Sequence, residues 1–208
     1  MPTSARTNVR MSGLERREQP LDVTRGIVIR DGFHGVSIEA VARDAGITRP
    51  VVYGHFRDLG DLLEALIERE AGLALAQLAP ILPGDLAKGD ARELLIAGLR
   101  GYLEAAEANP DTWRLVLMPP DGAPASLREH IASGRDAVIA HLAAAVRPGL
   151  VPHREPPDPE LAARMLSAAS DEAVRLLLTD PERYPVERLL ANADWALDVL
   201  IGGDESRR

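Results

Sequence analysis

Apolar residues first recur at helical spacing from Leu21, after a polar stretch without periodicity over residues 1–19. We expect residues 1–19 to form a flexible basic arm that ends at Pro20, either a disordered tail or a segment whose arginines take part in binding. The apolar residues from Leu21 predict a helix. This helix stops at the run Gly32-Phe33-His34-Gly35, which is typical of a helix end.

A short amphipathic helix is predicted next. Ser37 is its candidate N-cap, and Gly46 ends it. Apolar residues between these two positions recur at i, i+3, i+4 and i+7, so they form one stripe that can pack on a core. The residues of this stripe are Ile38, Val41, Ala42 and Ala45.

Two further helices follow directly. Thr48 can cap the first of them, and Pro50 stands in its first turn, where a missing N–H does no harm. This helix runs to about His55. Asp58 can cap the next one, which continues toward Leu78.

The rest of the chain reads as helices separated by proline-rich breaks. No run of alternating β-branched residues indicates a strand, so the fold class is all-α. The domains expected are a helix-turn-helix domain over residues 20–66 and a C-terminal helical domain over residues 67–208. The later helices are expected at about residues 91–108, 112–118, 125–146, 160–179 and 186–201.

Two short helices joined by a turn at Gly46 form a helix-turn-helix, the motif that places its second helix in the major groove of DNA. Thr48 and Arg49 stand at the N-terminus of that second helix, where they can reach base edges. Tyr53 and His55 lie at its other end and can reach the DNA backbone. The motif therefore predicts a DNA-binding protein.

Residues 25–70 resemble the DNA-binding segment of the tetracycline-repressor (TetR) family. The matching run is GFHGVSIEAVARDAGITRPVVYGHFRDLGDLLEAL. Its family features are a Gly-aromatic pair, a Ser cap, a small-residue helix that ends in Ala-Gly, and a recognition helix that ends in Tyr-x-His-Phe. Here these features are Gly32-Phe33, Ser37, Ala45-Gly46 and Tyr53-Gly54-His55-Phe56.

The resemblance implies a role for each matching position, and double-stranded DNA as a partner. Contacts to bases or nearby backbone are implied for Thr48, Arg49, Pro50 and Val51. Phosphate contacts are implied for Ser37, Tyr53 and His55. Phe56 corresponds to a core aromatic that anchors the recognition helix.

Two positions depart from the family pattern. Family members often have Lys and then an acidic residue where this chain has Leu59-Gly60, so one phosphate contact is missing, and Arg57 is the candidate to replace it. Gly54 stands where a larger side chain is common. These departures leave open a second function, a helical ligand-binding or interaction protein whose DNA binding is weakened.

The charge distribution supports a DNA-binding N-terminal part. The net charge of the chain is −8, but residues 1–57 hold nine Arg against six acidic residues, a net charge of +3. A basic segment on an acidic chain can bind phosphate because the local field decides binding.

The resemblance also implies a C-terminal domain with a ligand cavity and a homodimer interface. Candidate pocket residues, for which plain core packing is the alternative, are Tyr102, Trp113, Arg114, Leu117 and Met118. The last two helices would form the dimer interface, or else only close the monomer core. Their candidate interface residues are Leu161, Met165, Ala168, Ala169, Leu176, Leu189, Leu190, Ala193 and Leu197.

Several classes of protein are not expected. The chain has no Cys, which excludes disulfide scaffolds and thiolate metal sites and suits the cytoplasm. It shows no secretion signal and no apolar run long enough to span a membrane. Its five His residues show no metal-binding spacing, and no nucleotide-binding or hydrolase motif appears. We therefore expect neither catalysis nor a cofactor or metal.

The function expected is transcriptional regulation. A homodimer would bind a palindromic operator, with its two recognition helices about 34 Å or a small multiple apart. A small, apolar effector would release it, as from a repressor. An activator, or a regulator without an effector, is the remaining alternative.

Overall fold

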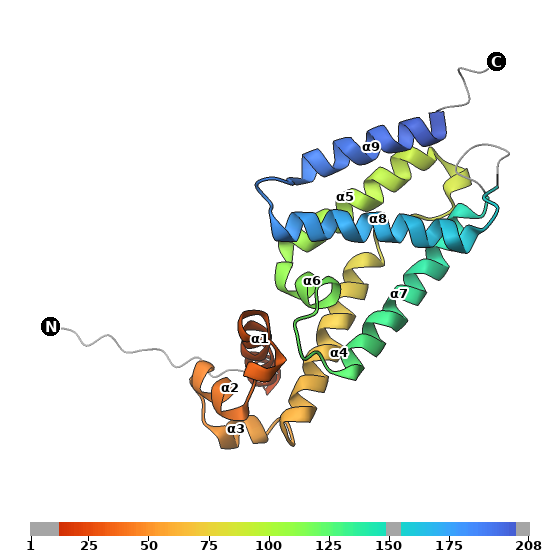
Figure 1. The fold of residues 1–208 in the computed structure, drawn as a ribbon. Helices are drawn as coiled ribbons and strands as arrows, with labels where there is room; N and C mark the ends of the chain where they lie inside the picture. The colour runs from red at the N-terminus through yellow and green to blue at the C-terminus, as the bar shows by residue number, and fades with distance from the viewer. Residues whose placement is uncertain (1–12, 149–154, 203–208) are drawn as a thin grey trace, which may run out of the picture. The chain divides into compact units, whose positions relative to one another are not determined.

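The computed structural model describes residues 13–148 and 155–202, which are entirely helices, turns and loops (Figure 1). This confirms the all-α class. Short 3-10 turns lie at Phe33–Gly35 and Leu86–Lys88. The α-helices are α1 (Gly13–Asp31), α2 (Ile38–Asp44), α3 (Arg49–Tyr53), α4 (Leu59–Leu78), α5 (Ala91–Ala108), α6 (Pro110–Leu117), α7 (Ala125–Val146), α8 (Pro159–Thr179) and α9 (Val186–Gly202).

The chain divides into two compact units. The first contains the chain up to Leu66 together with Pro120–Gly122, and the second contains the remainder. The chain passes from one unit to the other within α4. None of the helices in the described ranges is long and apolar enough to cross a membrane.

Helix α1 begins at Gly13, so residues 13–19, which the sequence assigns to a flexible arm, are helical; residues 1–12 of that arm lie outside the described residues. Pro20 lies inside the helix, and Thr24 Oγ1 donates to its carbonyl oxygen at 2.7 Å. Gln19 Nε2 donates to the carbonyl of Ala45 at 2.9 Å. Since this partner lies 26 residues away, the local pattern could not show what holds the first turns of α1.

The helix-turn-helix has the Ser37 cap and the Gly46 turn that its sequence predicts, whereas the side chain of Thr48 makes no capping bond. Ser37 Oγ accepts from the N–H of Ala40 at 3.1 Å and so caps α2. Gly46, at φ 66°, makes the turn in a conformation that favours glycine. The buried core of this unit includes Leu21, Ile27, Val28, Val41, Val52, Phe56 and Leu62.

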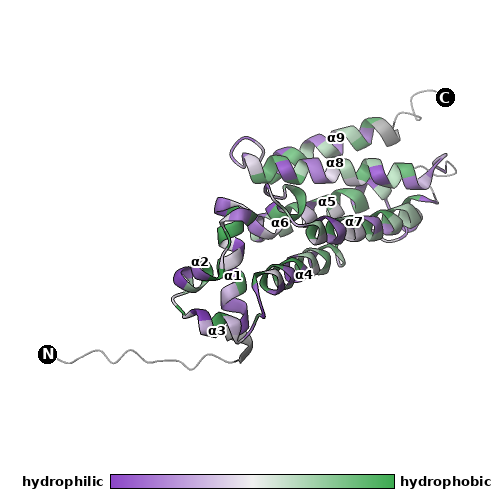
Figure 2. Ribbon diagram, turned by 60° about the horizontal axis from the view of Figure 1, so that its bottom comes forward, coloured by the Kyte–Doolittle hydropathy of each residue, from purple (hydrophilic) through white to green (hydrophobic). Residues whose placement is uncertain are grey.

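In the second unit, α8 packs against α5, α6 and α7, and α5 also packs against α9. Apolar segments coloured green run along these helices between polar ones (Figure 2). A core cluster of this unit joins buried residues from five helices, which places it between α4, α5, α6, α8 and α9. These residues include Tyr102, Leu103, Trp113, Leu117, Val174, Leu177 and Leu190.

Candidate functional site

Helix α3 buries a single residue, Val52, and exposes the rest of its length. Val52 is fully buried, which fixes α3 on its own unit. Tyr53 is 53% exposed, although an aromatic ring is normally more stable when it is buried than when it lies in water. The outward-facing residues are those expected to contact DNA bases and backbone: Thr48, Arg49, Pro50, Val51 and Tyr53.

The three hydroxyl and imidazole groups expected at DNA differ in their surroundings. Thr48 occupies the N-cap position of α3, but its side chain makes no capping bond, unlike that of Ser37. Its hydroxyl therefore remains available for a contact outside the helix. Ser37 and His55 are half-buried, and the His55 ring lies 6.4 Å from that of Phe56, between centroids.

Arg49 and Arg57, the arginines that flank α3, are already ion-paired. Arg49 Nη1 lies 2.7 Å from Glu39 Oε1, between the N-terminus of α3 and the first turn of α2. This hydrogen bond lowers the pKa of Glu39. Arg57, whose side chain is 86% exposed, donates to Asp61 at 2.9 Å and lowers the pKa of that carboxyl in the same way.

The departure at Leu59-Gly60 lies at the start of α4. Asp58 Oδ1 accepts from the N–H of Asp61 at 2.8 Å, so Asp58 caps this helix as predicted. A Cβ at Gly60 would lie 3.2 Å from that carboxylate oxygen, a close contact. Glycine therefore fits the cap geometry here, and Arg57 is the cation nearest in sequence to the missing Lys.

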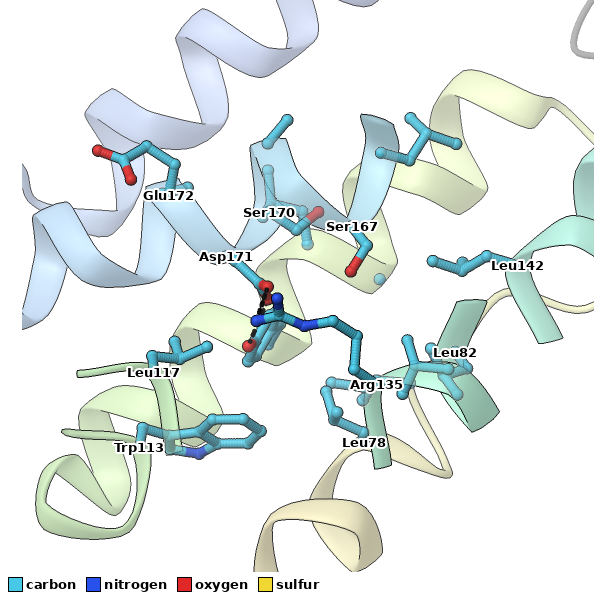
Figure 3. Close-up of a pocket in the computed structure, with 18 of the residues that line it drawn as sticks. Leu78, Leu82, Trp113, Leu117, Arg135, Leu142, Ser167, Ser170, Asp171 and Glu172 are labelled. Atoms are coloured by element: carbon cyan, nitrogen blue, oxygen red, sulfur yellow. Dashed lines mark hydrogen bonds and ion pairs between the residues drawn. The ribbon is translucent and has the colours of Figure 1, made fainter. Parts of the chain in front are cut away.

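The second unit contains a cavity of about 550 Å³ between α4, α5, α6, α7, α8 and α9 (Figure 3). Its wall is mostly Leu, Ile, Val and Ala side chains. A cavity of this size and lining is typical of small-molecule sites.

Three of the five predicted pocket residues line this cavity: Tyr102, Trp113 and Leu117. Arg114 and Met118 are not part of its wall. The helical period explains the split, since Trp113 and Leu117 share one face of α6, and the residue after each is turned away. Arg114 Nη2 instead donates to the carbonyl of Leu178 at 3.3 Å.

A polar cluster of Tyr102, Arg135 and Asp171 interrupts the apolar wall. Tyr102 Oη donates to Asp171 Oδ1 at 3.1 Å, and Arg135 Nη2 lies 3.2 Å from Asp171 Oδ2. Burial raises the pKa of both Asp171 and Tyr102. The sequence analysis missed Arg135 and Asp171, although Asp171 precedes Val174 and Leu178 by three and seven residues, which places a carboxylate on an apolar face.

The predicted interface residues of α8 and α9 fall on different faces. Leu161, Met165, Ala168 and Ala169 are exposed. Leu190 is buried in the monomer core. Four others line the cavity, namely Leu176, Leu189, Ala193 and Leu197, and Ala169 also contributes to its wall.

The exposed apolar face of α9 consists instead of Trp195, at 64%, and Val199, at 56%. The sequence analysis missed both, although their spacing of four residues places them on one side of a helix. The monomer core takes the other apolar stripe of α9, so Leu190 belongs to the core and not to the exposed face.

Within the described chain, no group of three or more His, Asp or Glu residues lies close enough to hold a metal ion. The first unit thus has a candidate DNA-binding surface on α3, and the second unit has a candidate ligand cavity.

Comparison with known proteins identifies the first unit. The family model of bacterial regulatory proteins, tetR family, matches residues 21–66. A TetR-like transcriptional regulator from Rhodococcus sp. RHA1 is similar over 94% of this chain and 100% of its own, with a TM-score of 0.72 and 23% identity.

Two fatty acid regulators have a similar fold. FadR from Bacillus subtilis, in complex with stearoyl-CoA, matches 89% of this chain and 98% of its own, with a TM-score of 0.63 and 19% identity. FadR from Bacillus halodurans matches 90% of this chain and 96% of its own, with a TM-score of 0.67 and 17% identity. At these identities the likeness concerns the fold alone. Residues 21–66 therefore match the tetR family of bacterial regulatory proteins, and the chain as a whole has the fold of a TetR-like transcriptional regulator.

Proposed function

We propose that the protein is a homodimeric repressor that binds a palindromic operator through α3 and leaves it when a small molecule occupies the cavity. The observation that carries this proposal is the exposure of α3 on a matched tetR domain. Such a regulator works in the cytoplasm, as the sequence predicts.

The side chains of α3 suit the major groove. Arg49 can donate two parallel hydrogen bonds to guanine, and Val51 can pack against a thymine methyl group. Thr48 and Pro50 face the same way, toward bases or nearby backbone. Tyr53, with Ser37 and His55, is assigned to phosphates, which set the register of the helix on the duplex.

Exposed apolar side chains of α8 and α9 support dimerisation. They are Leu161, Met165, Trp195 and Val199, four large side chains that the monomer leaves in water. A two-fold dimer buries the same face of both copies, and its symmetry matches a palindromic operator.

The cavity supports regulation by a ligand. FadR from Bacillus subtilis, which has a similar fold, has a structure in complex with stearoyl-CoA, so a protein of this fold can bind an acyl ligand. Here the apolar wall favours a small, largely apolar molecule. Release of DNA requires that this ligand bind the DNA-incompetent state more tightly than the DNA-bound state.

A second function has a specific observation in its favour. Lys is missing at Leu59-Gly60, and both Arg49 and Arg57 are tied to carboxylates. A helical ligand-binding protein with weakened DNA binding would have these features. An activator would differ from a repressor only in its effect on a promoter-reporter gene.

Fluorescence anisotropy with DNA from the intergenic region upstream of the gene, titrated with salt, tests the proposal. Saturable and sequence-selective binding that weakens steeply with salt is expected. Arg49→Ala should cost about 1–3 kcal/mol in binding free energy if Arg49 contacts a base. Arg128→Ala, an exposed arginine of α7, is the matched control and should have no effect.

Unchanged affinity of Arg49→Ala would show that the recognition helix is assigned wrongly. If the wild-type protein selects no duplex from a random DNA library, the second function is the correct one. A promoter-reporter strain with and without the gene then separates repression from activation.

A further inference from the structure

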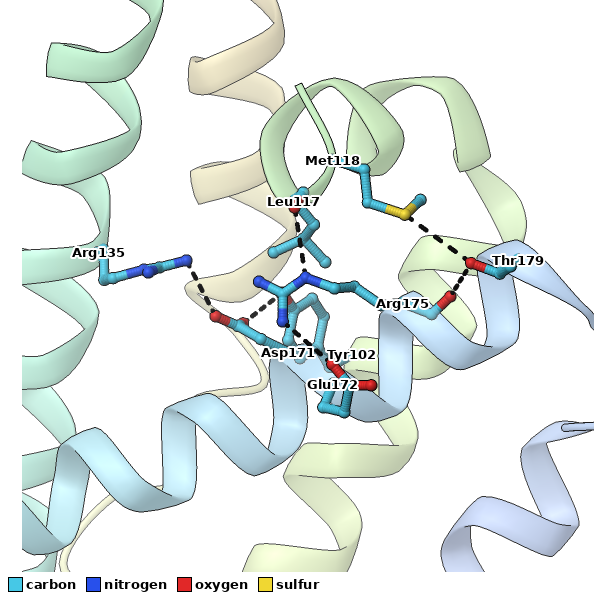
Figure 4. A network of polar contacts seen from close by, with 8 residues as sticks. All are labelled: Tyr102, Leu117, Met118, Arg135, Asp171, Glu172, Arg175 and Thr179. Carbon is cyan, nitrogen blue, oxygen red and sulfur yellow. Dashed lines mark hydrogen bonds and ion pairs between the residues drawn. The ribbon is translucent and has the colours of Figure 1, made fainter. Parts of the chain in front are cut away.

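The polar cluster of Tyr102, Arg135 and Asp171 is the feature of the cavity that selects a ligand by its polar group (Figure 4). Figure 3 shows Arg135 extending from α7 to Asp171 on α8, among apolar side chains of the wall. A ligand in this cavity meets mostly aliphatic carbon. Besides the polar cluster, the wall has the polar side chains of His130, Ser167, Ser170, Glu172 and Asn192.

The charges of the polar cluster and its neighbours balance. Arg135 neutralises Asp171, and beside them Arg175 Nη1 lies 3.5 Å from Glu172 Oε2. Arg175 Nε also donates to the carbonyl of Leu117 at 3.3 Å. A charged ligand would therefore have to break one of these pairs or remain without a counter-ion, and an unpaired charge in an apolar site is costly.

The polar cluster keeps hydrogen-bonding capacity for a neutral group. A guanidinium has five N–H donors, and an ionised carboxylate accepts about four hydrogen bonds. The bond between Arg135 and Asp171 and the bond from Tyr102 use only part of this capacity. A group that both donates and accepts, such as a hydroxyl or an amide, matches what remains.

We propose that the effector is an uncharged amphiphile with one hydroxyl or amide group, which bonds to Asp171 and Arg135, and an apolar body that fills the rest of the cavity. This inference rests on the proposed function, because it names the ligand class of the same cavity. It excludes free carboxylates and amines as preferred ligands.

Isothermal titration calorimetry of the purified full-length protein with three probes of equal chain length tests this class. The probes are 1-decanol, decanoate and decylammonium, each below its aggregation concentration. Decanol should bind at least about tenfold more tightly than either ion, because it buries no unpaired charge. Decyl methyl ether, which cannot donate, should bind more weakly than decanol.

Charge-changing variants provide the sharper test. Asp171→Asn frees Arg135 from its counter-ion, so decanoate should gain affinity by about tenfold or more. Arg135→Gln leaves Asp171 with its charge, so decylammonium should gain instead. Asp136→Asn and Arg128→Gln on α7 lie outside the wall and should leave all three affinities unchanged.

The inference is overturned if the wild-type protein binds either ion as tightly as decanol, or binds none of the probes. A variant that thermal unfolding shows to be unfolded is set aside, and the wild-type series then decides. DNA binding is measured separately by anisotropy. If decanol binds but does not release DNA, the proposed regulation through the cavity is wrong, while the proposed ligand class remains supported. If the protein binds DNA but binds no probe, only the proposed ligand class is wrong.

Discussion

Arg49 pairs with Glu39 at the surface that would meet DNA, and both side chains are exposed. An arginine held by a carboxylate must exchange that partner for a base or a phosphate when DNA binds. Because exposed ion pairs contribute little free energy, Glu39 is expected to tune the affinity and not to prevent binding.

Glu39→Gln should therefore raise operator affinity by up to roughly fivefold, since it removes a competitor and a negative charge near the phosphates. Anisotropy titrations of the wild type and the variant measure the gain. In an Arg49→Ala background the same substitution should have a smaller effect. An equal gain in both backgrounds would show that Glu39 acts by general repulsion.

Asp171 gives the free energy of unfolding a characteristic pH dependence. Its pKa is raised by burial, so the folded protein binds a proton more readily than the unfolded chain, whose Asp has an ordinary pKa of 3.8. The contribution of Asp171 to stability is therefore greatest below that value. It falls as pH rises from there through the raised pKa of the folded state.

Urea unfolding of the wild type and of Asp171→Asn, from about pH 4 to pH 7, measures this contribution. The wild type should lose stability relative to the variant as pH rises. Asp136→Asn, which changes an exposed carboxylate of α7, serves as the control. Its free energy of unfolding should differ from that of the wild type by the same amount at every pH. If the wild type instead gains stability relative to Asp171→Asn as pH rises, the pKa of Asp171 is not raised.

At the level of elements, a buried carboxylate joins α4 to α6. Glu70 is only 1% exposed and accepts from Thr112 Oγ1, and Arg69 Nη2 donates to its other oxygen at 2.8 Å. A carboxylate taken out of water needs such donors. The packing of α6 on α4 therefore depends on one hydroxyl group as well as on apolar contact.

Thr112→Val keeps the shape of the side chain and removes its hydroxyl. The loss of a hydrogen bond to a buried charge should lower the free energy of unfolding by about 1.5–3 kcal/mol. Urea denaturation measures the change. Thr179→Val, in which an exposed hydroxyl is removed from α8, should change stability by less than about 0.5 kcal/mol. Equal effects of the two substitutions would rule out this role for Thr112.

At the scale of the whole molecule, the surface formed by α8 and α9 keeps large apolar side chains in water. Met165 on α8 and Trp195 on α9 are 67% and 64% exposed. Large exposed apolar side chains of this kind are typical of protein interfaces. Dimerisation through this face would remove them from water and would supply the second DNA-binding domain.

Trp195→Asp should weaken the dimer by roughly a hundredfold in dissociation constant, because it removes an apolar anchor and buries a charge. Sedimentation equilibrium measures the change, and operator affinity should fall with it. Leu73→Asp places the same charge at an exposed apolar position of α4, and the protein should still sediment with the mass of a dimer. A dimeric Trp195→Asp protein would place the interface elsewhere.

Local chemistry explains what the sequence could predict. Caps and turns depend on a few neighbouring residues, so Ser37, Asp58 and Gly46 could be assigned correctly without any tertiary information. Helical periodicity showed the all-α class in the same way. Tyr102 and Trp113 could also be proposed for the cavity wall, because they are among very few aromatic residues of the chain.

The sequence by itself therefore determined most of the helices, the caps at Ser37 and Asp58, the helix-turn-helix and the tetR resemblance, because each depends on residues within a few turns of one another. Only the tertiary structure decided which apolar stripe of α9 faces the core and that Asp171 meets Arg135 from another helix. It also decided that residues 13–19 are helical, and there Gln19 bonds to the carbonyl of Ala45, 26 residues along the chain. Such contacts join distant residues, and a local pattern carries no record of them.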